Sequence, residues 1–183
     1  MEMKHLDPLL KHLRSLEIAP APPPWFHVTT RAIGGLTAVG FDRTSELLLI
    51  VSSAGRGVVD GATGQKVARD TTDYYEDSTF LEAAGIGPLL GKTIRMAGLF
   101  GGGLPTITAD GWKVEQVCLN WPITEVLLVE PGSDLFDVPY GKTGKFHKIM
   151  EWDEIRACGF SYSGNTFVIA TPSDIAIYSK QVA

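Results

Sequence analysis

Residues 39–51 read Val-Gly-Phe-Asp-Arg-Thr-Ser-Glu-Leu-Leu-Leu-Ile-Val, which is a short apolar stretch, a polar turn and a long apolar run. The same order returns at residues 117–129 and again at residues 157–169. Cys158 follows Cys118 by 40 positions, whereas the first two copies are separated by about twice that spacing, so one degenerate unit lies between them. A period in this range is typical of stacked supersecondary units.

The turns inside these units repeat as well. Residues 60–65 and residues 140–145 are offset by 80 positions, and each contains two glycines. Glycine adopts a positive φ without a Cβ clash, which suits tight hairpins between antiparallel strands. The local pattern therefore predicts a β-meander.

The order of turn, apolar strand, glycine turn and Thr-Gly turn resembles a blade of the WD-repeat kind of β-propeller. Gly57 to Gly64 fits the end of such a blade, as do Leu135 to Val138 with Thr143-Gly144, and Ser173 to Tyr178 fits its strand. The resemblance covers about half of the chain. At about 40 residues per blade, 183 residues supply at most four blades, so it implies a small or incomplete propeller.

The predicted fold is mainly β, with antiparallel, blade-like β-meander repeats and a short N-terminal helix. A short helix is also predicted from Phe80 to Leu90. Apolar runs bounded by glycine, proline and aspartate indicate the strands, at residues 36–41, 46–52, 56–60, 113–119, 125–130, 134–138, 155–160, 166–170 and 174–179.

The first residues differ in kind from the rest. An amphipathic helix is predicted within residues 1–19, a stiff proline-rich linker at residues 20–25, and a single β-repeat body at residues 26–183. The helix either binds a partner or a second copy of the chain, or covers an open face of the sheets. Its apolar stripe consists of leucines spaced three and four apart, Leu6, Leu9, Leu10, Leu13 and Leu16.

Composition limits the function classes. The net charge is −5, and the basic residues are scattered, which argues against a nucleic-acid partner because binding phosphates requires clustered Lys and Arg. No apolar run approaches the ~20 residues that span a bilayer, and the N-terminus lacks the features of a signal peptide. With Cys118 and Cys158 both interpreted as small buried strand residues, neither a disulfide framework nor a thiol site is expected. The cytoplasm is the expected compartment.

Two irregular segments are the predicted binding surface. Asp73, Tyr74, Tyr75, Glu76 and Asp77 combine acids with adjacent tyrosines, and tyrosine offers a rigid contact area with a hydroxyl at interfaces. The alternative is a solvated acidic loop.

The second segment is the glycine run Gly101, Gly102 and Gly103, where the backbone bends or approaches another group closely. A flexible hairpin tip is the alternative interpretation of this run.

Motifs that carry catalysis are weak in this chain. The sequences around Gly91-Lys92-Thr93 and Gly141-Lys142-Thr143 lack the first glycine of a phosphate-binding loop, and Ser161 lacks the closing glycine of a nucleophile elbow. The histidines and cysteines have no metal-ligand spacing. No catalytic residue, metal or cofactor is therefore predicted.

Two functions from different classes follow. The favoured one is a non-catalytic protein-binding module, such as an immunity or antitoxin-like protein that occludes a basic protein partner, with homo-oligomers through the N-terminal helix or open sheet edges. The alternative is an enzyme or small-ligand-binding protein with a pocket formed between repeats, in which carboxylates and His27 or His147 are the candidate residues.

Overall fold

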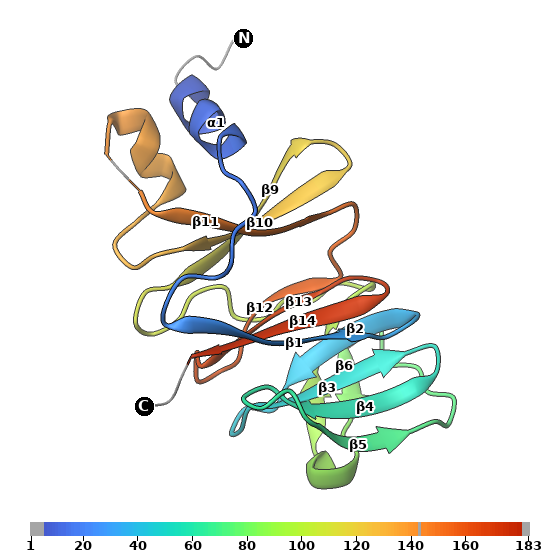
Figure 1. Cartoon of the computed structure of the whole chain (residues 1–183). Coiled ribbons are helices and arrows are strands. Elements are labelled where there is room, and N and C mark those ends of the chain that lie inside the picture. The colour runs from blue at the N-terminus through green and yellow to red at the C-terminus, as the bar shows by residue number, and fades with distance from the viewer. Residues whose placement is uncertain (1–5, 143, 181–183) are drawn as a thin grey trace.

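Three antiparallel sheets are stacked face to face in the computed structural model, and a small cap covers each end of the stack (Figure 1). The structure describes residues 6–142 and 144–180. The predicted class, mainly β with antiparallel sheets and a short N-terminal helix, is confirmed. Residues 1–5 of the predicted helix and Thr143 of the predicted Thr-Gly turn lie outside the described residues.

Each sheet contains a meander of consecutive strands, to which β8 (Ala97–Gly98) adds an edge strand in one sheet and β1 (Trp25–Ala32) adds one in another. We name the two outer sheets after the hairpin and the helix that cover them. The hairpin-side sheet has the order β5 (Lys66–Asp70), β4 (Gly55–Asp60), β3 (Leu47–Ser52), β2 (Leu36–Phe41) and β8. The middle sheet has the order β1, β14 (Asp174–Lys180), β13 (Thr166–Ala170) and β12 (Ala157–Phe160). The helix-side sheet has the order β11 (Phe146–Trp152), β10 (Ile123–Val129) and β9 (Lys113–Asn120).

The middle sheet buries both of its faces. Because side chains alternate between the faces of a strand, Val168 of β13 packs with the hairpin-side sheet and its neighbour Ile169 packs with the helix-side sheet. In β14, Ile177 packs with the hairpin-side sheet and Tyr178 packs with the helix-side sheet. A sheet buried on two faces needs continuous apolar strands, and this explains why residues 166–170 show no polar alternation.

Aromatic rings fill the space between the middle sheet and the helix-side sheet. Trp25, the residue that the sequence placed at the end of the linker, is the buried first residue of β1. Its ring packs edge-on against Trp112 and tilted against Phe160, with centroids 6.1 and 5.4 Å apart. Phe167 completes the group.

The outer faces of the two flanking sheets are also apolar and are covered by the caps. Helix α1 (Asp7–Arg14) lays Leu9 and Leu13 on Leu127 and Phe146 of the helix-side sheet, beside the 3-10 helix η3 (Leu135–Tyr140). The apolar stripe of this helix thus covers a sheet face of its own chain.

At the other end, the hairpin-side sheet carries the capping hairpin, formed by β6 (Glu82–Ala84), the 3-10 helix η2 (Gly87–Leu89) and β7 (Thr93–Arg95). Ile94 and Met96 pack there on Leu49 and Val51.

Two predicted elements were wrong. Residues 134–138 form not a strand but the start of η3, because the Asp134 carboxylate accepts a hydrogen bond from Phe136 N and caps a turn. The helix predicted from Phe80 to Leu90 is instead the strand β6 followed by η2. Six strands of the described residues were not predicted: β1, β5, β6, β7, β8 and β11.

The first and last copies of the predicted repeat have corresponding residue pairs, and the middle copy does not. Val39 pairs with Ile50 in the first copy, and Cys158 pairs with Ile169 at the equivalent place of the last copy; Val39 and Cys158 are both buried. In the second copy β9 turns directly into β10 after Asn120, so the register differs. The prediction that Cys118 is buried is therefore wrong: its side chain is exposed.

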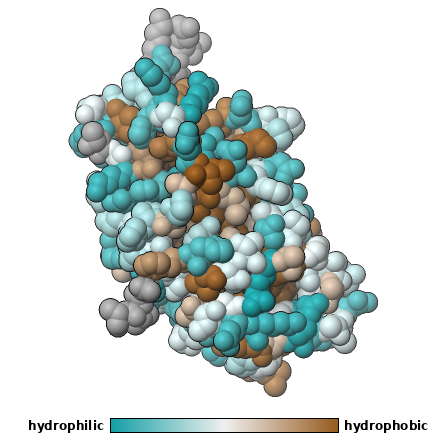
Figure 2. Space-filling model, in the orientation of Figure 1, coloured by the Kyte–Doolittle hydropathy of each residue, from teal (hydrophilic) through white to brown (hydrophobic). Residues whose placement is uncertain are grey.

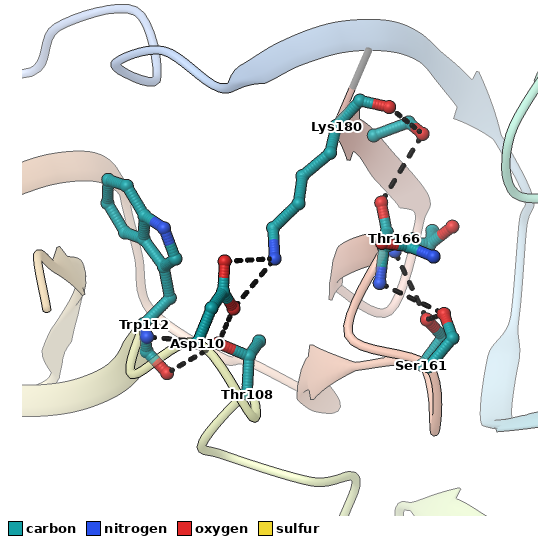
Figure 3. A network of polar contacts seen from close by, with 9 residues as sticks. Thr108, Asp110, Trp112, Ser161, Thr166 and Lys180 are labelled. Atoms are coloured by element: carbon teal, nitrogen blue, oxygen red, sulfur yellow. Dashed lines mark hydrogen bonds and ion pairs between the residues drawn. The ribbon is translucent and has the colours of Figure 1, made fainter. Parts of the chain in front are cut away.

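Loops tie the sheets together by polar contacts. Figure 3 shows Lys180, at the end of β14, reaching the carboxylate of Asp110 at 2.9 Å, in the connection between β8 and β9. Thr108 Oγ1 donates to the same carboxylate at 2.6 Å and accepts from Trp112 N at 2.9 Å. The Thr108 hydrogen bond is the largest influence on the pKa of Asp110, which is lowered despite partial burial.

The two cysteines give a direct test of the register. In the folded protein we expect the exposed Cys118 to react rapidly with a thiol reagent such as 5,5′-dithiobis(2-nitrobenzoate). Cys158 should react only on unfolding, because burial raises the pKa of its thiol far above the usual range. Replacing Cys158 by serine buries a hydroxyl and should cost about 1–3 kcal/mol of unfolding free energy, and Cys118→Ser should change it by less than about 0.5 kcal/mol. Equal labelling rates for the two thiols would contradict this register.

A buried carboxylate links the capping hairpin to its sheet. Lys92 Nζ lies 2.8 Å from Oδ1 of Asp42, whose side chain is almost fully buried. Burial by itself would raise the pKa of Asp42, but hydrogen bonds from Lys92, Ser45 and Thr44 outweigh it and lower the pKa from 3.8 to about 2. The folded pKa therefore lies below the unfolded one, so this stabilisation is complete above about pH 4 and is lost as the pH falls through 2.

We therefore expect Asp42→Asn to lower the unfolding free energy by about 1–3 kcal/mol at pH 7, measured by urea denaturation, and to flatten its decline between pH 4 and pH 2. The control is Asp137→Asn, which removes the solvent-exposed pair with Lys142 and should cost less than about 1 kcal/mol. An unchanged acid profile in Asp42→Asn would refute the assignment.

Candidate protein-binding surface

The two segments that the sequence singled out meet at the start of β2. Thr37 Oγ1 donates a hydrogen bond to Glu76 Oε2 at 3.2 Å, and the Thr37 carbonyl accepts one from Leu99 N at 2.8 Å. Glu76 belongs to the loop between β5 and β6, and Leu99 belongs to the turn that carries the glycine run. Thr37 thus holds together two loops that are more than 20 residues apart in the chain.

The two adjacent tyrosines have different environments. Tyr75 is 88% exposed. Tyr74 is half-buried: its ring lies under the Arg56 guanidinium, with 3.9 Å from the guanidinium carbon to the ring centroid, and its hydroxyl accepts a hydrogen bond from Ala84 N at 2.7 Å. Tyr74 therefore anchors the loop to the capping hairpin, whereas the Tyr75 ring lies in solvent.

The acidic residues of this loop also divide into exposed and buried side chains. Asp73 and Asp77 are exposed, and Asp77 Oδ1 accepts from the backbone of Thr79 and Phe80 at 2.9 and 3.0 Å. Glu76 is buried, and its Oε1 has no hydrogen-bond partner within the described residues. Glu76 holds the loop on Thr37, while the two aspartates contribute negative charge at the surface.

The base of this loop is fixed by a further ion pair. Asp70 accepts hydrogen bonds from Thr72 and from Arg56 Nη2, and these, in that order of size, lower its pKa to about 2. The same Arg56 covers the Tyr74 ring. One guanidinium therefore orders both ends of the segment from Asp70 to Tyr74.

Backbone shape explains two of the three glycines in the run. Gly101 and Gly102 have φ of +114° and +85°, and a Cβ on Gly102 would come within 2.2 Å of the Met96 carbonyl oxygen. Gly103 has open space where its Cβ would be. Gly98 N donates a 2.9 Å hydrogen bond to Gly101 O that closes the turn, so the glycines shape a tight turn.

Large apolar side chains that the sequence argument overlooked project from the same two segments. Phe100, at the tip of the glycine turn, is 57% exposed, and Leu99 beside it is 49% exposed. Phe80 is 69% exposed, and the adjacent Leu81 carbonyl accepts from Met96 N at 2.7 Å, which places Phe80 near the strand that leads into the turn. The signal available in the sequence was bulky apolar residues within irregular segments.

We call these residues together the Thr37 surface. It consists of the exposed side chains on the two loops that Thr37 joins, namely Asp73, Tyr75, Asp77, Phe80, Leu99 and Phe100, with the backbone of residues 101–103.

The residues proposed for a catalytic pocket have separate partners. His27 Nε2 lies 2.8 Å from Thr30 Oγ1 and its ring packs on Tyr178, whereas His147 Nε2 lies 2.8 Å from Glu130 Oε1. Within residues 6–142 and 144–180, no group of three His, Cys, Asp or Glu side chains is placed to hold a metal ion.

Comparison of the chain with protein-family models, with curated proteins and with solved structures finds no match. The resemblance to WD-repeat blades therefore stays a prediction. In the part of the chain that the structure describes, no helix has the length and apolar character needed to cross a membrane.

The different environments of the two tyrosines predict different costs on truncation. Tyr74→Ala removes a cation–π contact and a hydrogen bond and should lower the unfolding free energy by about 1–3 kcal/mol, with Tyr74→Phe in between. Tyr75→Ala should change it by less than about 0.5 kcal/mol because the ring is in solvent. Chemical denaturation of the three variants measures these values; a Tyr75 cost as large as that of Tyr74 would show that its ring packs on the protein.

Proposed function

We propose that this chain is a non-catalytic protein-binding module whose contact surface is the Thr37 surface. The observation that supports it most is that two irregular loops, joined at one strand residue, together expose the large apolar side chains of Tyr75, Phe80 and Phe100. Apolar side chains scattered singly are normal on a protein surface, but a group of them on adjoining loops is typical of interaction sites.

The contacts that hold the two loops in place favour binding. Arg56, Tyr74 and Thr37 hold the acidic loop in place, and the hydrogen bond between Gly98 and Gly101 fixes the glycine turn. Binding to a preorganised surface loses less conformational entropy, and tyrosine and phenylalanine supply large contact areas with few rotatable bonds.

Charge points to the kind of partner. Asp73 and Asp77 flank Tyr75, and the whole chain carries a net charge of −5. Negative charge around an apolar centre attracts a basic protein and accelerates its association. An immunity or antitoxin-like role against a basic partner in the cytoplasm is the specific form of the proposal.

The test is affinity capture from the native host with matched variants of the full chain. We expect a basic protein to co-purify with the wild type, and Tyr75→Ala combined with Phe100→Ala to weaken its binding about tenfold or more, which corresponds to about 1.4 kcal/mol. Trp121→Ala is the control, because Trp121 is 89% exposed but lies on the turn between β9 and β10 in the helix-side sheet.

Higher salt should mainly slow association with the captured partner, since the aspartates act through long-range attraction. Equal capture by the wild type and the Tyr75/Phe100 variant, or loss of capture in Trp121→Ala alone, would place the contact surface elsewhere.

A further inference from the structure

A cleft of about 330 Å³ opens between the middle sheet and the hairpin-side sheet. The end of β1 and the first residues of the β1–β2 turn form one wall, and strands β3, β4 and β5 form the other. This volume is near the lower end of the range for small-molecule sites. The cleft lies on the opposite face of the hairpin-side sheet from Tyr74, which packs with the capping hairpin.

The floor of the cleft is apolar and has room above it. Ile50 and Val59 belong to the core between the two sheets, and Gly57 lies directly opposite Ile50 across the β3–β4 ladder. A Cβ on Gly57 would meet nothing nearer than the Ala68 carbonyl oxygen at 3.8 Å, and Gly57 does not have a positive φ. The hollow therefore exists because this strand position has no side chain.

The rim of the cleft is cationic. Arg31 of β1 and Lys66 and Arg69 of β5 line it, and its lining includes no acidic side chain. Lys66 pairs with Val59 across the ladder, and Arg69 pairs with Gly57, so both basic residues leave β5 beside the apolar floor. Figure 2 shows hydrophilic and apolar residues mixed over the lower part of the molecule, where Figure 1 shows β4 and β5.

Backbone carbonyls hold the two arginines, and none of the three cations has an ion-pair partner among the described residues. Arg31 Nε and Nη2 donate to the Gly64 carbonyl at 2.9 and 2.5 Å, and Arg69 Nη2 donates to the Ala54 carbonyl. None of the ion pairs within the described residues involves Arg31, Lys66 or Arg69. A positive cleft in a chain with a net charge of −5 is a local reversal of sign.

We infer that this cleft binds a small organic anion, with its apolar body on Ile50, Gly57 and Val59 and its phosphate or carboxylate group against Arg31, Lys66 and Arg69. Guanidinium groups held by carbonyls present their remaining N–H donors in a fixed geometry, which suits recognition of anionic oxygens. The apolar floor adds affinity by removing hydrocarbon from water. This inference is independent of the Thr37 surface.

The first experiment titrates the full-length protein with phenyl phosphate, benzoate and inorganic phosphate, followed by amide chemical shifts in ¹H–¹⁵N spectra. We expect phenyl phosphate or benzoate to shift the amides of Gly34 and Gly57, and the better of the two to bind about tenfold or more tightly than inorganic phosphate, which lacks the apolar body. The comparison of the two aromatic anions identifies which anionic group is preferred. Shifts confined to other residues, or equal binding of inorganic phosphate, would overturn the inference.

Variants separate the two halves of the site. Gly57→Leu fills the floor but keeps all three cations, so it should weaken the aromatic anion about tenfold and leave inorganic phosphate unchanged. Lys66→Gln, at an exposed position, should weaken both anions several-fold and reduce the salt dependence of binding. Lys142→Gln, which removes a 69% exposed lysine after η3, is the control and should change neither.

The Lys66 variant keeps the inference testable if Gly57→Leu does not fold, and thermal unfolding establishes the folding of each variant. Aromatic-anion affinity that is unaffected by Lys66→Gln, or reduced equally by Lys142→Gln, would show that the anions bind without using the cleft.

Discussion

The burial of the middle sheet on both faces is the constraint on which the rest of this structure depends. Val168 and Ile169 are adjacent on β13 yet belong to different hydrophobic cores, and both are fully buried. A sheet of this kind requires another sheet on each side. The flanking sheets then have apolar outer faces of their own, which α1 covers at one end and the capping hairpin covers at the other. The order of the layers thus follows from the requirement to remove each apolar face from water.

The middle sheet is completed by segments from distant parts of the chain. Strand β1, near the N-terminus, pairs along its length with β14 near the C-terminus, and the connection from β8 to β9 runs past the opposite edge, where Phe160 N donates to the Pro105 carbonyl at 2.7 Å. The β12 edge is therefore covered, which limits unwanted pairing with other chains there, and β1 is the other edge strand of the sheet. The Lys180–Asp110 pair in Figure 3 joins that connection to the last strand.

The same stacking leaves two surfaces with opposite character. Loops at the start of β2 lie outside the stack and can present Tyr75 and Phe100 without weakening the core. The cleft arises where the hairpin-side sheet extends to β5 beside β1 and where Gly57 leaves the floor open. Acidic side chains lie on the first surface and basic side chains line the second, so the two surfaces differ in the sign of their charge.

The sequence by itself determined the strands with continuous apolar runs, such as Leu47 to Val51 and Phe167 to Ala170, and the leucine stripe of the N-terminal helix, because periodicity and turn residues act locally. It also identified the two loops of the candidate surface. Only the tertiary structure decided which sides these elements bury. The short β9–β10 turn exposes Cys118, the Asp134 cap makes a predicted strand helical, and Arg56 draws Tyr74 but not Tyr75 onto the protein. The turn and the cap are set by single polar or turn residues that the apolar pattern does not register, whereas the Arg56–Tyr74 contact joins a strand to a loop beyond the next strand, which local patterns do not encode.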